Sequence, residues 1–213
     1  MNYLKLKQSV LQNGINILGW RTNKKYVVIE SDDWGTIRTP SKSILRSLRD
    51  KNYPVDDCVF TSNDSLERDK DLVSLFEVLS SVKDKNGNNA VVTANNVVAN
   101  PDFNKIKENN YELYEYELFT ETLKKYPNSS NVFNLYQQGI ERSLFIPQFH
   151  GREHLNVFRW MQALKNKHIG VKYGFDLEMF TFNYRKNIGA KEAFLDAFGI
   201  SNEMEKEYLD SII

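Results

Sequence analysis

The sequence predicts an α/β protein built on a parallel sheet, and two observations support this class. Short apolar runs rich in β-branched residues alternate along the chain with longer segments whose apolar residues recur at helical spacing. Strand, helix, turn and strand follow one another between residues 26 and 94, which is typical of a parallel βαβ unit. The 213 residues, of which 41% are hydrophobic, indicate a globular chain that forms one domain over 1–213.

The first predicted βα unit begins with an apolar run at 26–30, which we expect to form a buried strand. A polar cluster, 31–35, follows at the carboxyl end of that strand. A helix should begin near 39–41, with Pro40 in its first turn. Its apolar face is expected to comprise Ile44, Leu45 and Leu48. Residues 50–70 are polar and irregular, and predict an inserted loop.

The following elements continue the same alternation of helices and strands. Apolar residues at helical spacing predict a helix ending near Val82. A turn at 85–89 separates this helix from a second buried strand at 90–94. Asn100-Pro101-Asp102 predicts the start of another helix. Further elements are expected as a helix at 133–139, a strand at 144–149, a helix ending near Lys167, and helices at 190–198 and 202–211.

Charge and cysteine content exclude several classes of protein. The chain carries 28 basic and 28 acidic side chains, so a nucleic-acid binder, which needs a basic excess or stripe, is not expected. Its single cysteine, Cys58, excludes an intramolecular disulfide and a cysteine-based metal site. No apolar stretch reaches eighteen residues and the N-terminus lacks the features of a secretory signal. We therefore expect no membrane span and a cytoplasmic location.

Two pairs of side chains carry the candidate chemistry. Asp32 and Asp33 end the first predicted strand, where an acidic pair is also common in ordinary turns. His150 and His154 follow the strand at 144–149, and their i, i+4 spacing would place both imidazoles on one helical face, close enough to share a cation. Two solvated histidines are the alternative. The third histidine, His168, is expected at the surface.

The conjunction of the two pairs is more informative than either pair alone. Asp33 and His150 are 117 positions apart, yet the carboxyl ends of parallel strands meet at one rim of the fold, where active sites form. Two histidines and one carboxylate make a metal site with open positions for water and substrate. The second carboxylate of the acidic pair is then left as a general base.

These motifs resemble the polysaccharide deacetylase superfamily with the NodB-homology fold. Similarity extends over about residues 24–165. The family's usual first motif is Thr-Phe-Asp-Asp-Gly, and the form Asp-Asp-Trp-Gly in this sequence is closer to the Asp-Asp-Phe-Gly of the related YdjC-like carbohydrate deacetylases. The resemblance implies a distorted (β/α) barrel, with Asp32 as the catalytic base. It also implies one divalent metal ion, zinc or alternatively cobalt, nickel or manganese. The ligands of that ion would be Asp33, His150 and His154.

The later motifs of the family have no counterpart in this sequence. The family has an arginine-containing strand and a Leu-x-His whose histidine acts as general acid, whereas no histidine follows His168. We therefore expect a barrel that is incomplete at its C-terminal side, with 166–213 as an irregular or helical tail or insertion. An incomplete barrel exposes a sheet edge and apolar surface. We therefore expect either poor stability or cover from a partner chain, a homo-oligomer or a missing C-terminal segment.

The function implied by the resemblance is metal-dependent hydrolysis of an N- or O-linked acetyl group on a sugar or polysaccharide. Trp34 and Arg152 are the candidate substrate contacts. Ordinary packing is the alternative for Trp34, and an ion pair with Glu153 is the favoured interpretation of Arg152. Two other functions stay open. The chain could be a weak or inactive metal- or sugar-binding remnant of such an enzyme, or it could hydrolyse another bond, such as a phosphate ester, at the same metal.

Overall fold

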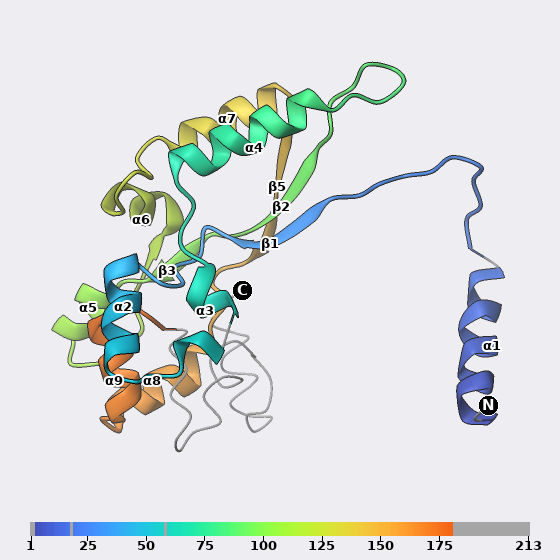
Figure 1. Cartoon of the computed structure of the whole chain (residues 1–213). Helices are drawn as coiled ribbons and strands as arrows, with labels where there is room; N and C mark the ends of the chain where they lie inside the picture. The colour runs from blue at the N-terminus through green and yellow to red at the C-terminus, as the bar shows by residue number, and fades with distance from the viewer. Residues whose placement is uncertain (1–2, 18, 58, 181–213) are drawn as a thin grey trace.

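The computed structural model of the chain describes residues 3–17, 19–57 and 59–180 (Figure 1). The helices expected at 190–198 and 202–211 lie outside these residues. The α-helices are α1 (Tyr3–Ile17), α2 (Lys42–Asp50), α3 (Val59–Asn63), α4 (Asp69–Ser81), α5 (Phe103–Glu108), α6 (Phe119–Lys125), α7 (Val132–Glu141), α8 (Val157–Lys165) and α9 (Ile169–Asp176). The strands are β1 (Glu30–Trp34), β2 (Val92–Val97), β3 (Ala99–Pro101), β4 (Tyr116–Leu118) and β5 (Phe145–Gly151), and a short 3-10 helix covers Val55–Asp57.

The main sheet has three strands in the order β1-β2-β5, and both pairs of neighbouring strands are parallel. The predicted parallel pairing is therefore confirmed for these strands. β3 and β4 form a separate antiparallel pair. Within the described part of the chain the strands do not close into a barrel, so the NodB-type barrel stays a prediction.

Helices α4 and α7 lie side by side against one face of the main sheet (Figure 1). The helical spacing predicted for α4 is confirmed, because Leu72, Phe76 and Leu79 are buried in this layer. They pack with α7 and with Phe145 of β5, which is completely buried. Burial of this apolar stripe between the helices and the sheet stabilises the packing of α4 and α7 on the sheet.

A second hydrophobic core lies beyond the carboxyl ends of the strands, where α5, α8 and α9 pack together. Its centre is a group of aromatic rings that meet edge to face: Trp160 lies 6.1 Å from Phe103, and Phe103 lies 5.2 Å from Phe175, measured between ring centroids. Ile37, from the loop after β1, is buried in the same core. This core therefore fixes the loop that follows the acidic pair.

The bounds predicted for the first strand are wrong. β1 begins at Glu30, and the apolar run before it is exposed, with Val27 at 88% and Val28 at 73% exposure. Pairing with β2 ends at the hydrogen bond from Thr93 N to Ile29 O, and the residues that precede Val92 lead into the turn closed by the Lys83–Asn89 bridge. The run therefore has the composition of a buried strand without a partner among the described residues.

The predicted start of the helix after β2 is also partly wrong. Asn100 and Pro101 belong to β3, and Asp102 is the N-cap, whose carboxylate accepts a hydrogen bond from Lys105 N. Pro40 likewise precedes α2 rather than lying in its first turn, since Ser41 caps that helix. The segment 50–70, expected as an irregular loop, contains the 3-10 helix and α3 as well as the start of α4.

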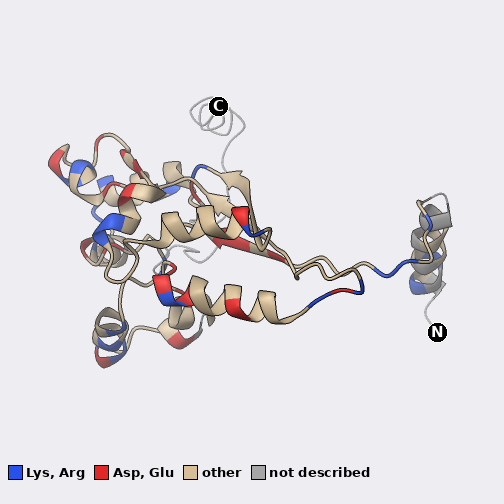
Figure 2. Cartoon of the chain, turned by 90° about the horizontal axis from the view of Figure 1, so that it is seen from above, with Lys and Arg blue, Asp and Glu red and all other residues tan. Residues whose placement is uncertain are grey.

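Helix α1 stands apart from the rest of the chain at the end of an extended segment (Figure 1). Acidic and basic residues are interspersed over the other helices, as expected for a chain of zero net charge (Figure 2). Among the described residues no helix combines the length and the apolar character needed to cross a membrane.

Candidate metal centre

Asp33 lies at the carboxyl end of β1, where the strand leaves its regular pairing with β2. The register is regular at Ser31 and again at Trp34, with an irregularity between them. Asp33 has a φ of 64°, in the left-handed region that aspartate tolerates better than most residues. Gly35 follows with a φ of 79°, and a Cβ atom there would lie 2.8 Å from the carbonyl oxygen of Val97. This tight turn directs the Asp33 carboxylate toward β5.

The two histidines reach the same point from β5 and from the loop behind it. His150 belongs to β5 and His154 to the loop before α8, so the prediction that they share a helical face is wrong. Gly151, with a φ of 126°, is the last residue of β5, and the chain turns between it and His154. The carbonyl of Arg152 accepts hydrogen bonds from Val98 N and Ala99 N, which ties this turn to the end of β2.

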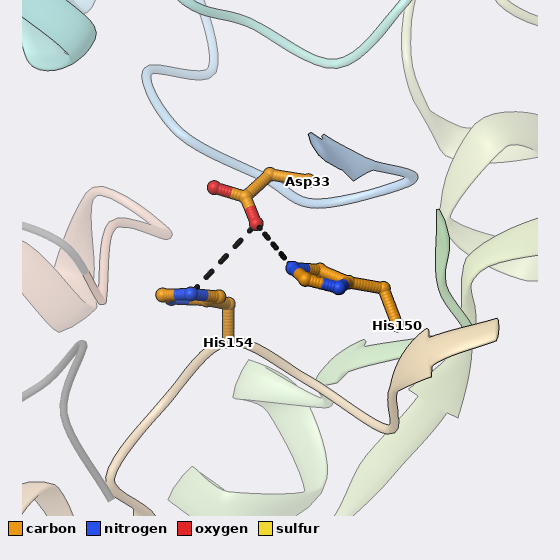
Figure 3. A group of neighbouring side chains, drawn as sticks. All are labelled: Asp33, His150 and His154. Atoms are coloured by element: carbon orange, nitrogen blue, oxygen red, sulfur yellow. Dashed lines mark ion pairs between the residues drawn. The ribbon is translucent and has the colours of Figure 1, made fainter. Parts of the chain in front are cut away.

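The three side chains converge on one small volume (Figure 3). Asp33 Oδ1 lies 3.5 Å from His150 Nε2 and 3.8 Å from His154 Nε2. Both distances exceed those of a hydrogen bond. They are near the separation of about 3.4 Å between ligands that share a tetrahedral ion at 2.0–2.1 Å. The geometry therefore fits a cation held between the three atoms.

An unpaired buried oxygen supports the same interpretation. Asp33 Oδ1 is buried and has no hydrogen-bond partner among the described residues. Nδ1 of His154 is also buried without one, but it is not the nitrogen that faces Asp33, so it carries no argument for the ion. A buried carboxylate oxygen without a partner is costly unless a ligand satisfies it. Oδ1 faces two imidazole nitrogens that can act as metal ligands, so this donor set fits a divalent ion such as zinc.

Asp32 lies beside the centre with its side chain on the exposed side of β1. Its Oδ1 accepts a hydrogen bond of 2.7 Å from Nδ2 of Asn95, on the neighbouring strand β2. Asp32 and Asp33 both line a hollow of about 680 Å³. The two adjacent carboxylates therefore have different surroundings, since Asp33 faces the histidines and Asp32 faces an amide.

The two candidate substrate contacts are largely engaged within the protein. Trp34 lines the hollow but also packs edge to face against Phe145, with ring centroids 5.1 Å apart. The guanidinium of Arg152 donates two hydrogen bonds, of 2.5 and 2.9 Å, to the carboxylate of Glu153. It also lies 4.9 Å from the ring centre of Tyr116. The ion pair expected between Arg152 and Glu153 is thus confirmed, while a role in substrate binding stays a prediction for both residues.

Glu67 is a buried acid beside the centre that the sequence did not single out. Its Oε1 accepts a hydrogen bond from the hydroxyl of Tyr136, and its Oε2 accepts one of 3.3 Å from Gly35 N. Asn96 donates in turn to the Tyr136 oxygen at 3.2 Å. The residue as a whole is partly exposed, whereas its carboxyl group is enclosed, and this burial raises the pKa of Glu67 above its ordinary value of 4.5. Glu67 thereby anchors the turn that carries Asp33.

The raised pKa of Glu67 predicts a pH-dependent contribution to stability. A carboxyl group whose pKa is higher in the folded state stabilises the fold fully below its unfolded pKa, and this contribution is lost as pH rises through the folded value. Glu67→Gln mimics the protonated acid. We expect the free energy of unfolding of the wild type, relative to this variant, to fall in urea titrations as the pH rises above the ordinary glutamate value of 4.5. The same comparison with Glu141→Gln, an exposed glutamate on α7, should stay flat, and equal slopes would contradict the prediction.

Comparisons of the chain with protein-family models, with curated proteins and with solved structures found no match. The function is therefore inferred from the residues and the geometry described above.

Proposed function

We propose that the chain is a metal-dependent hydrolase that removes acetyl groups from a sugar or polysaccharide. The observation that carries the proposal is the convergence of Asp33 Oδ1 and the two histidine Nε2 atoms. A second carboxylate, Asp32, lines one hollow together with Asp33. Two histidines and one carboxylate leave coordination positions open for water and for a carbonyl oxygen. The resemblance of the two motifs to the deacetylase superfamily supports the acyl group as the target.

A divalent ion bound there would lower the pKa of a coordinated water and stabilise the negative charge that develops on the acyl oxygen. The protein supplies the remaining functions. Asp32 would take a proton from the attacking water, and the hydrogen bond from Asn95 Nδ2 would hold its carboxylate in position. Attack on the acyl carbon breaks its bond to the sugar nitrogen or oxygen, so acetate and the free amine or hydroxyl are the products.

One observation favours a second candidate, a remnant with weak or no activity. The chain has three histidines, and the third, His168, is the N-cap of α9, where its Nδ1 accepts a hydrogen bond from Val171 N. No imidazole is therefore left to protonate the leaving group. In this candidate the centre binds an ion, and the hollow binds a sugar, without rapid turnover.

Replacing Asp32 by Asn tests the proposed base. We expect acetate release from acetylated chito-oligosaccharides to fall by about 10²–10⁴-fold, the usual contribution of a general base, while the bound metal is retained. Asp50→Asn, which changes an exposed aspartate at the end of α2, is the control and should keep wild-type activity. Full activity in Asp32→Asn would show that another group acts as the base. A wild-type protein that holds the ion but releases no acetate would favour the remnant.

A further inference from the structure

The Asp33 carboxylate has one oxygen in an ion pair and one without a partner. Arg38 donates from a terminal guanidinium nitrogen to Asp33 Oδ2 at 2.6 Å. The other oxygen, Oδ1, is the atom that faces His150 and His154 and has no hydrogen-bond partner among the described residues. A carboxylate held at one oxygen in this way presents the other in a single orientation.

Arg38 is itself fixed in place. It is 6% exposed, and the ring of Phe60 lies over its guanidinium at 5.8 Å. Of its neighbours in the chain, Ile37 is buried in the second core and its backbone N–H donates to Oδ1 of Asn100 at 2.9 Å. On the other side, Thr39 donates through its hydroxyl to the carbonyl of Thr61 at 2.6 Å.

The same buried asparagine also fixes the turn that carries Asp33. Asn100 is fully buried, and its Nδ2 donates to the carbonyl of Gly35 at 2.8 Å. One side chain thus binds the backbone at both Gly35 and Ile37. The hydrogen bonds of Asn100 therefore fix the backbone on either side of Thr36, and this places Arg38 next to the Asp33 carboxylate.

We propose that Arg38 is the positioning residue of the metal centre: by holding Asp33 Oδ2, it directs Oδ1 to the ion and limits Asp33 to coordination through one oxygen. This inference rests on the proposed metal site and concerns how that site is organised. Partners of metal ligands fix the orientation of those ligands, and their loss typically lowers metal affinity about 10–100-fold. Planar guanidinium geometry suits this task better than the single ammonium of lysine.

The test compares the metal affinity of purified Arg38→Met and wild-type proteins by titrating Zn²⁺ and Co²⁺ against a competing chelator. We expect Arg38→Met to bind both ions about 10–100-fold more weakly. Arg38→Lys should recover only part of that loss, and the visible spectrum of bound Co²⁺ should differ from that of the wild type. Arg49→Met is the matched control, because Arg49 makes an equally short ion pair, of 2.5 Å with Asp56, in an exposed position. It should bind metal like the wild type.

The outcomes separate the positioning role from the metal site itself. Wild-type affinity and an unchanged Co²⁺ spectrum in Arg38→Met would overturn the role of Arg38 and leave the metal centre standing. No metal binding by the folded wild-type protein would overturn both. If Arg38→Met does not fold, Arg38→Lys decides alone, and wild-type affinity with an unchanged spectrum in that variant would overturn the proposal.

Discussion

Replacing either His150 or His154 by Ala is expected to abolish tight binding of one divalent ion. Each imidazole supplies one of the three protein atoms that converge on the centre, so either substitution leaves only two ligands. The loss should exceed the about 10–100-fold typical of an outer partner of a ligand, because a coordinating atom is itself removed. Metal content measured by mass spectrometry after dialysis should fall from about one ion per chain, as expected for a single site of this type, to near zero.

His168→Ala is the matched control for the two histidine variants. This residue caps α9 and makes no contribution to the three-atom cluster, so the variant should retain the ion. Circular dichroism of all three variants shows whether the fold persists. Full metal retention in both His150→Ala and His154→Ala would mean that the ion binds elsewhere, and the ligand assignment would then be wrong.

Replacing Gly139 by Ala should destabilise the protein although alanine is the better helix former. Gly139 lies in α7, where its Cβ atom would be 2.5 Å from the ring of Phe76 and 2.8 Å from Cβ of Phe145. The intrinsic helix preference of alanine gains at most about 1 kcal/mol. Phe145 is completely buried in the sheet, so α7 must move away from it, and such overpacking typically costs about 1–3 kcal/mol or more. We expect a net loss of stability, measured as a lower urea midpoint.

Gly14→Ala is the control for helix propensity alone. Gly14 lies within α1, and a Cβ atom there would meet no atom within 4 Å. Its urea midpoint should equal or exceed that of the wild type. A Gly139→Ala protein as stable as the wild type would show that α7 can shift from the sheet at little cost.

Local sequence patterns predicted most of the regular elements. The apolar spacing in α4, the start of α2 and the apolar run of β5 each depend on residues close together in the chain, and each lies within a few residues of its predicted place. The exposed run before β1 shows the limit of such patterns. Its side chains favour a buried strand, but burial depends on a neighbouring strand, and no local signal shows where the pairing with β2 ends.

Some residues of the candidate site could be predicted from the sequence, and others could not. Parallel strand ends meet at one rim, so the sequence could bring Asp33 together with the two histidines, even though the helical geometry expected for the histidines was wrong. The sequence did not single out Arg38 or Glu67. Arg38 reaches Asp33 only because the loop after β1 folds back on itself, and Glu67 reaches Gly35 from a segment 32 positions further along the chain. Arg38 follows Asp33 by five positions, and the two side chains meet because the chain turns at Asp33 and Gly35, which both have positive φ.

Asp33 and His150 lie on the two outer strands of the sheet, and His154 lies in the loop that follows β5, which has a mechanical consequence. β1 and β5 touch β2 but not each other in the order of the sheet, so the three candidate ligands meet only across the carboxyl end of the central strand. An ion held there would link two segments of the chain that are 117 positions apart. A ligand that binds only the folded state stabilises it in proportion to the logarithm of its concentration. An ion at this centre would thus also stabilise the sheet, and its removal would lower the free energy of unfolding.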